Sequence, residues 1–184
     1  MKTLKTFAAA TATAALLATG AIAANPEVGG APMFENKNIV ENAVNSADHT
    51  TLVAAVKAAG LVDTLASEGP FTVFAPVNSA FDALPAGTVD TLLKPENKDM
   101  LTKVLTAHVV AGNWSAADIA AKARASGDGF YHFNAVSGDA LSAQVKGNNV
   151  YIIDESGNAS RVTIADVNQS NGVIHVVNSV LVPK

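Results

Sequence analysis

Two short apolar runs, each closed by a proline, set the strongest limit on how this chain can fold. The first covers residues 71–74 within GPFTVFAPVNSAFDALP, and the second lies within GVIHVVNSVLVP, residues 172–183. β-Branched and aromatic residues dominate both runs, so each is predicted to be a strand buried on both faces. A chain of 184 residues is long enough for one well-buried core. We therefore expect the two strands to lie side by side in that core.

The segment after the first run is predicted to turn directly into a short helix. Pro76 cannot donate to a strand ladder and so ends the strand. Asn78 has a side chain suited to a helix N-cap, and the helix is predicted to continue through Phe81. A strand, a proline and a capped helix thus follow one another within a few residues.

Helical and strand patterns occupy different parts of the chain. Helical periodicity predicts helices near residues 39–44, 50–59, 61–65, 89–93, 95–108 and 115–124, with Gly60 ending the second. Alternating patterns predict strands at 131–136, 141–146, 149–153, 159–164, 173–177 and 179–182. Helices first and consecutive hairpins afterwards favour an α+β fold over an alternating α/β fold.

Three stretches resemble the signature motifs of the fasciclin I domain family. They are TVFAPVNSAFDALP (72–85), LTAHVVAG (105–112) and NGVIHVVNSVLVP (171–183). The resemblance implies a β-wedge of about seven mainly antiparallel strands flanked by several helices. It also implies a secreted or cell-surface module involved in adhesion and extracellular interactions. The motif positions expected to be structural are Phe74, Pro76, Asn78, Phe81, His108, Gly172, His175 and Pro183.

The start of the chain has the pattern of a removable export signal. Lys2 and Lys5 precede an apolar run, and small residues at Ala21 and Ala23 suit a signal peptidase. The alternative, a retained membrane anchor, is disfavoured because threonines interrupt the run. We expect a signal peptide at 1–23, a flexible lead at 24–35 and the fasciclin I domain at 36–184. The mature chain is then expected to be periplasmic or extracellular, without membrane insertion.

Charge and cysteine content narrow the classes of partner. The formal charge is −4, and loss of the two leader lysines takes it to −6. An acidic domain without clusters of Lys and Arg binds polyphosphates poorly, so nucleic acid is not expected as a partner. The chain has no cysteine, so stability must come from burial alone.

No motif for catalysis, cofactor binding or metal binding is present in the sequence. The four histidines lack metal-ligand spacing. His175 shares a strand face with Val173 and Val177, and His108 lies at a helix end. Each is interpreted as a hydrogen-bonded structural histidine, the alternative being a ligand or partner contact. An Asp166–His175 catalytic pair is a third hypothesis, weaker than binding.

Three residues are candidates for contact with a partner. Trp114, the single tryptophan, is either a surface anchor or a cover for the edge of the core. Integrin-binding fasciclin domains carry an Asp-Ile pair before the last motif, and Asp166-Val167 stands at the matching place here. The resemblance therefore implies Asp166 and Val167 as interaction candidates.

The function expected from these observations is that of a secreted, non-catalytic binding module. Its partner would be an extracellular or envelope protein, or a matrix component. The alternative is a carrier of a lipophilic small molecule such as a carotenoid, which some members of the family bind. An apolar slot between sheet and helices would serve that second function.

Overall fold

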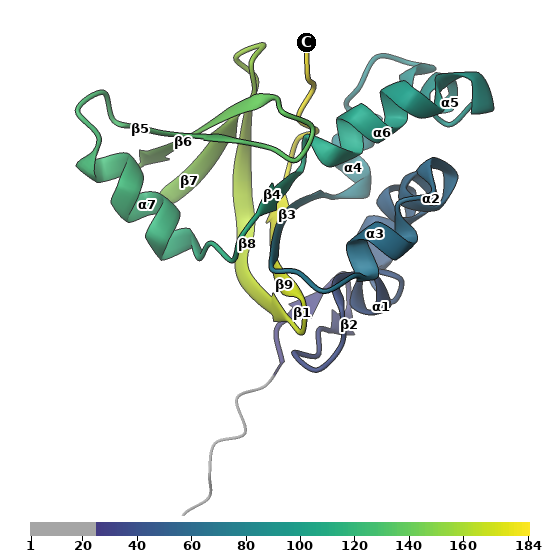
Figure 1. Cartoon of the computed structure of the whole chain (residues 1–184), viewed down its shortest axis with the longest axis horizontal. Coiled ribbons are helices and arrows are strands. Elements are labelled where there is room, and N and C mark those ends of the chain that lie inside the picture. The colour runs from purple at the N-terminus through teal and green to yellow at the C-terminus, as the bar shows by residue number, and fades with distance from the viewer. Residues whose placement is uncertain (1–24) are drawn as a thin grey trace, which may run out of the picture.

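The two apolar signature strands pair directly at the centre of the molecule. In the computed structural model, which describes residues 25–184, β3 (Phe71–Pro76) lies parallel to β9 (Gly172–Val177) along its whole length. Phe74 stands opposite His175 in this register. Figure 1 shows the pair running through the middle of the fold. The expectation that these distant strands are neighbours is confirmed.

The described residues form a seven-stranded, mainly antiparallel sheet in the order β4-β3-β9-β8-β7-β6-β5. The strands besides β3 and β9 are β4 (Val109–Ala111), β5 (Phe130–Asn134), β6 (Ala140–Lys146), β7 (Asn149–Ile153) and β8 (Ala159–Gln169). The pairing of β3 with β9 is the parallel one, and the sheet's other neighbours are antiparallel. The α+β fold class predicted from the sequence is confirmed.

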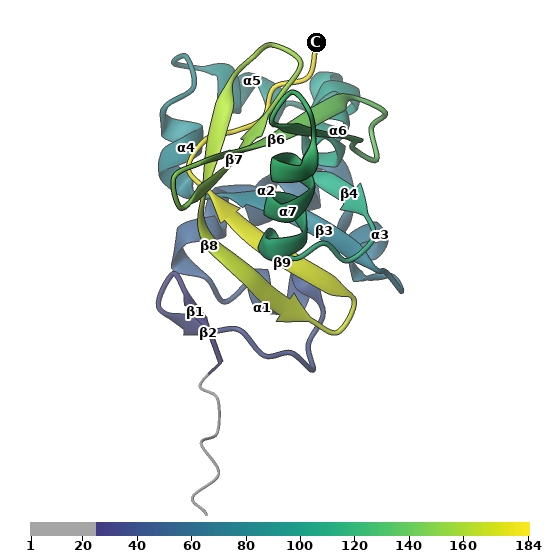
Figure 2. The same cartoon turned by 90° about the vertical axis from the view of Figure 1, so that its left-hand side faces the viewer.

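Helices cover the sheet from two sides. They are α1 (Ile39–Ala43), α2 (Thr50–Ala59), α3 (Val62–Ala66), α4 (Asn78–Asp82), α5 (Thr88–Leu92), α6 (Lys98–Thr106) and α7 (Ala116–Ala125), with single 3₁₀ turns at Ala47–His49 and Pro95–Asn97. In Figure 1, α1 to α6 lie on one side of the central strands and α7 lies on the other. Figure 2 shows α7 crossing in front of the sheet.

Alternation along β3 and β9 builds a core on each side of the central pair. Val73 and Ile174 belong to the cluster beneath α1, α2, α3 and α6. Phe74 and Val177 belong to a second cluster shared with α7 and β5 to β7. All six residues of β9 are buried, as a strand covered on both faces requires.

Gly172 is required at the start of β9 because the two central strands approach closely there. A Cβ at this position would lie 2.0 Å from the carbonyl oxygen of Phe71. No side chain can occupy that space without moving backbone. The motif glycine therefore has a packing role.

The segment expected to be a lead before the domain contains secondary structure from residue 27 onward. β1 (Glu27–Val28) and β2 (Ala31–Pro32) form a small hairpin whose turn residues, Gly29 and Gly30, both have positive φ. Val28 and Met33 are 3% and 2% exposed and belong to the helix-side core. Strands of two residues show no periodicity, which is why the sequence did not reveal them. The predicted signal peptide lies outside the described residues.

Asn78 caps a different helix from the one predicted. Val77 occupies the N-cap position of α4, with no side-chain cap bond. The Asn78 side chain instead accepts from the Thr51 N–H (3.0 Å) and donates to the Ala47 carbonyl (2.8 Å). It therefore satisfies the first turn of α2, which has no side-chain cap of its own. The left-handed Gly60 that ends α2 is found as predicted.

The last predicted strand, residues 179–182, is absent. The chain beyond Val177 runs extended, and its amides bond to side chains: Leu181 N–H to His108 Nε2 at 2.8 Å, and Val182 N–H to an Asp154 carboxylate oxygen at 2.9 Å. Pro183 lies in this terminal segment. β8 is longer than predicted and continues to Gln169 through two register shifts.

Replacement of Phe74 by alanine is expected to lower the free energy of unfolding by about 3–5 kcal/mol. The ring is 1% exposed and stacks on His175. The change therefore leaves a cavity in the core between the central strands and α7. Urea denaturation measures the loss. Met100→Ala is the control, since Met100 is 60% exposed. A loss below about 1 kcal/mol for Phe74→Ala would contradict the placement of the core.

Candidate functional site

His175 ties the central strand to two neighbouring segments. Its Nδ1 accepts from the Asp166 backbone N–H (3.2 Å), and its Nε2–H donates to the Trp114 carbonyl (2.8 Å). The side chain is 0% exposed. Burial lowers the pKa of His175 from its usual value, against the opposing influence of the Trp114 carbonyl and Asp166. The imidazole is therefore neutral, with both ring nitrogens engaged in structural bonds.

Asp166 sits at a backbone irregularity and caps α7. It has a positive φ of 58° between the displaced halves of β8. Its carboxylate accepts from the Ala116 N–H at 2.7 Å, at the first residue of α7. Asp166 thus offers its amide, and not its carboxylate, to His175. The geometry of a catalytic Asp–His pair is not formed by these two residues.

Trp114 is half-buried and belongs to an aromatic cluster at the start of α7. Its indole N–H donates to the Ala111 carbonyl (3.0 Å), and its ring contacts that of Tyr131 at 5.8 Å between centroids. Lys122 Nζ lies 3.4 Å from the Trp114 ring centroid, a cation–π contact. Part of the indole therefore covers the edge of the core, and Lys122 lies over the indole ring.

Val167 does not fit the role of a partner contact. It is 0% exposed and belongs to the helix-side core. The prediction that it meets a partner is wrong for this conformation, because no surface of the side chain is accessible. Of the implied pair, only Asp166 is exposed. The structure brings Asp166 and Trp114 together through His175, an arrangement that linear spacing could not show.

His108 is buried, and both of its ring nitrogens form hydrogen bonds. Its Nδ1–H donates to the Val104 carbonyl (2.7 Å), and its Nε2 accepts from the Leu181 N–H (2.8 Å). It joins the end of α6 to the C-terminal segment. Burial lowers the pKa of His108 to about 4, against the opposing influence of the Val104 carbonyl and Asp154.

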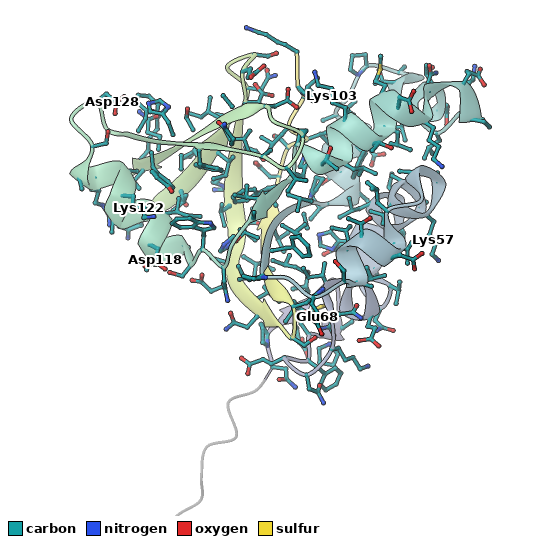
Figure 3. All side chains as sticks on the ribbon, in the orientation of Figure 1. Lys57, Glu68, Lys103, Asp118, Lys122 and Asp128 are labelled. Carbon is teal, nitrogen blue, oxygen red and sulfur yellow. The ribbon has the colours of Figure 1, made fainter. Side chains whose placement is uncertain are left out.

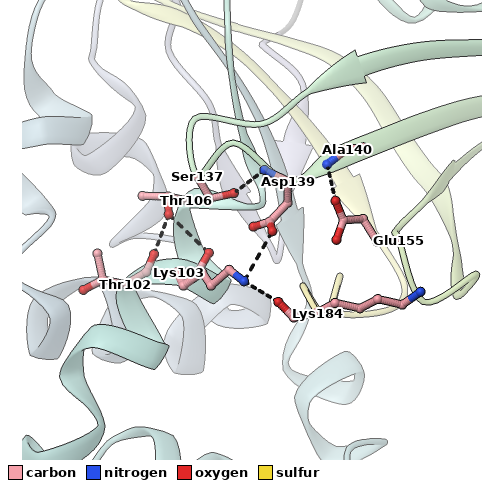
Figure 4. A network of polar contacts seen from close by, with 8 residues as sticks. All are labelled: Thr102, Lys103, Thr106, Ser137, Asp139, Ala140, Glu155 and Lys184. Atoms are coloured by element: carbon pink, nitrogen blue, oxygen red, sulfur yellow. Dashed lines mark hydrogen bonds and ion pairs between the residues drawn. The ribbon is translucent and has the colours of Figure 1, made fainter.

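A polar network that the sequence did not reveal holds the C-terminus. Lys103 on α6 pairs with Asp139 at 3.4 Å and donates to the Lys184 carbonyl oxygen (Figure 4). Nearby, Glu155 accepts from the Ala140 N–H at 2.9 Å. Lys103 and Asp139 lie 36 residues apart in different elements. The network ties α6, the β5–β6 turn and the tail together and contains no reactive pair.

An apolar cavity of about 80 Å³ lies between the helices and the central strands. Its walls are mainly aliphatic and come from α1, α2, α3, β3 and β9, among them Ile39, Leu52, Val73 and Ile174. An apolar slot was expected between sheet and helices, which is where this cavity lies. His49, which no motif in the sequence distinguishes, is one of the polar residues in the wall.

Residues 25–184 contain neither a metal-ligand cluster nor a membrane-spanning helix. No group of three or more His, Asp or Glu residues converges there. None of the helices in this part of the chain has the length and apolar character needed to cross a bilayer.

The fold is that of a FAS1 domain. The structure superposes with a TM-score of 0.69 on a FAS1 domain pair from the insect cell adhesion molecule Fasciclin I, at 18% identity, over 79% of this chain and 50% of that one. A family model for the fasciclin domain matches residues 47–183. The chain belongs to the fasciclin domain family.

Relatives of the chain occur in bacteria and animals. It is 51% identical over 145 residues to Protein sll1483 of Synechocystis sp., covering 79% of this chain and 73% of that protein. It is 36% identical to Immunogenic protein MPB70 of Mycobacterium bovis, over 77% of this chain and 66% of the relative. It is 38% identical to Transforming growth factor-beta-induced protein ig-h3 of Sus scrofa, over 72% of this chain and 17% of the relative.

Stability is expected to fall by about 3 kcal/mol through His108 alone as pH drops from 6.5 to 4. The unfolded histidine binds a proton near pH 6.5, whereas the folded one resists protonation until about 4. The unfolded state therefore holds more protons in this window, and stability rises with pH. His49 and His175, whose pKa values are lowered by burial, add in the same direction.

Urea denaturation at several pH values between 7 and 4 measures this dependence. In His108→Gln the slope should be shallower, because that titrating group is gone. His132→Gln is the control, since His132 is exposed and pairs only with surface groups. An unchanged slope in His108→Gln would contradict the assignment.

Proposed function

We propose that this domain is an exported, non-catalytic binding module for an extracellular or envelope protein, or for a matrix component. Membership of the fasciclin family supports an adhesion-type role. The observation that carries the proposal is the state of the central polar groups. His108 and His175 are buried, neutral and fully hydrogen-bonded, and Asp166 caps a helix. These three groups are engaged in structural hydrogen bonds, and none of them is free for acid–base chemistry.

The candidate contact surface is the corner where α7 begins, formed by Trp114, Lys122 and Asp166. Lys122 and Asp166 are exposed, and Trp114 is half-buried. Figure 3 shows Lys122 on the α7 side of the molecule, across the sheet from Lys57. Tryptophan is among the residues enriched in protein-binding hot spots, and the charges of Lys122 and Asp166 suit the polar rim of an interface.

Affinity capture tests the proposal. The immobilised mature domain, offered envelope and matrix fractions, should retain a component that is identified by mass spectrometry. Asp166→Asn keeps an oxygen to cap α7 but removes the charge, so it should bind that component roughly tenfold more weakly. Glu68→Gln, a charge change at an exposed site away from this corner, is the matched control.

Two results would count against the proposal. One is that nothing is retained above beads carrying heat-denatured domain. The other is that Asp166→Asn and Glu68→Gln retain the component equally well, which would place the contact elsewhere on the molecule.

The apolar cavity favours a second candidate function, the carriage of a lipophilic small molecule such as a carotenoid. Its walls are aliphatic and it lies between two layers of structure, as small-molecule sites often do. An organic extract of the purified protein, analysed by mass spectrometry, tests this candidate directly. A pigmented or lipid-containing extract supports it, and an empty extract removes it.

A further inference from the structure

The wall of the apolar cavity contains a single charged side chain, that of Lys57. Most of the other lining residues are aliphatic, and four of the polar ones form hydrogen bonds within the protein: Ser46, His49, Thr106 and His108. A ligand that is polar along its length does not suit such walls, because it would lose its hydration there. A charged group on a ligand is therefore favoured only beside Lys57.

Lys57 lies where the cavity meets solvent. It belongs to the last turn of α2, and both Lys57 and Thr64 of α3 are exposed members of the wall. The cavity therefore opens between these two helices, at the surface where Figure 3 shows Lys57. The methylene stem of a lysine commonly lies along apolar surface while its ammonium group stays in water. Val136 is also exposed and lines the cavity, but its side chain offers no polar group to a ligand.

The ammonium group of Lys57 has no anionic partner among residues 25–184. The ion pairs in this part of the chain join Lys103 to Asp139 and His132 to Asp128. The lysine ammonium groups that donate hydrogen bonds there are those of Lys103 and Lys122. Lys57 is thus a cation available to an anion at the mouth of the cavity.

The volume of the cavity favours a chain over a ring. About 80 Å³ is several times the roughly 10–15 Å³ that one water molecule needs, but only about half of the roughly 150 Å³ of an engineered apolar cavity that holds benzene. An unbranched alkyl chain is narrower than a ring, so its end fits where a ring does not. The remainder of the chain can extend to the mouth.

We propose that the cavity binds an unbranched alkyl carboxylate, with its chain between the helices and the sheet and its carboxylate paired with Lys57. This inference rests on the carrier function proposed above and narrows its ligand to an anionic molecule with a straight chain. Burial of methylene groups supplies most of the affinity. The Lys57 charge supplies the preference for an anion and sets the direction in which the chain enters.

Three probes with the same alkyl chain test the charge preference on the mature protein. They are octanoate, octanol and octylammonium. NMR titration of ¹³C-methyl-labelled protein should show octanoate binding about threefold more tightly than octanol, and octylammonium more weakly than both, because an exposed ion pair contributes modestly. The net charge of −6 after loss of the two leader lysines would favour the opposite order if only non-specific attraction acted. Added salt should reduce the preference for octanoate.

Variants separate the charge of Lys57 from the cavity itself. Lys57→Gln keeps most of the stem and removes the charge, so it should bind octanoate and octanol equally. Lys146→Gln is the matched control, because Lys146 is an exposed lysine of β6 outside the cavity wall. Val53→Phe, at a half-buried wall position on α2, should fill the cavity and weaken octanoate and octanol alike.

Two further measurements test the pose without any mutation. Intermolecular NOEs should place the terminal methyl group of octanoate near Val73 and Ile174 of the central strands, which line the cavity. Hexanoate should bind more tightly than cyclohexanecarboxylate, which carries the same head group on a ring. Equal binding of these two acids would contradict the preference for a chain.

Three other results would overturn the proposal: octanol or octylammonium binding as tightly as octanoate, a preference for octanoate that survives Lys57→Gln, or no NOE between any probe and the cavity wall. The carrier function is tested separately by the organic extract. A neutral pigment or lipid in the extract of a protein that shows no preference for octanoate would support the carrier function and remove the Lys57 site. An empty extract from a protein that prefers octanoate through Lys57 would remove the carrier function and support the site.

Discussion

The parallel contact between β3 and β9 is the constraint on which the rest of the structure depends. A parallel pair needs a long connection, and here residues 77–171, more than half of the described chain, lie between the two strands. β4 extends the sheet from the free edge of β3, and β8 extends it from the free edge of β9. Since both faces of the pair are buried, helices must cover one side while α7 and the hairpins cover the other. The close approach at Gly172 fixes the register of the two strands.

Buried polar side chains, and not covalent links, connect the outer elements to this centre. His175 joins β9 to Asp166 and Trp114, while His108 joins α6 to the terminal segment. Asn171, beside Gly172, donates to the carbonyls of Leu65 and Ser67 and accepts from the Ile39 N–H. A domain without cysteine thus holds its segments in place through hydrogen bonds between buried polar groups. These groups are used structurally, which agrees with a module that binds.

The sequence predicted those features whose signals are local or strongly apolar. The central pair, the order of helices and hairpins, and the end of α2 at Gly60 followed from pattern and residue type. Prediction from the sequence failed where the interacting residues are distant in the chain and come together only in the fold. Asn78 caps a neighbouring helix, and Val28 is buried from a hairpin too short to show a period.

In the candidate site, too, the sequence indicated individual residues but not the contacts between them. Asp166 and Trp114 were singled out separately, and only the fold shows that His175 links them. Val167 was chosen for its place in a motif, yet the register shifts of β8 bury it in the core. The burial of His49 in the cavity wall is visible only in the fold, because nothing in the adjacent sequence distinguishes this histidine from the others.

The central claim is that the β3–β9 ladder is the most stable part of the domain and the frame for every surface on it. Native-state hydrogen exchange at pH 7 tests this claim most directly, with the amides of β3 and β9 as reporters. These amides should exchange only through global unfolding, so the free energy of opening derived from their exchange rates should equal the free energy of unfolding measured with urea. The amides of the outer hairpin, β5 and β6, should exchange sooner. If the β3 and β9 amides exchange before those of β5 and β6, the account is wrong.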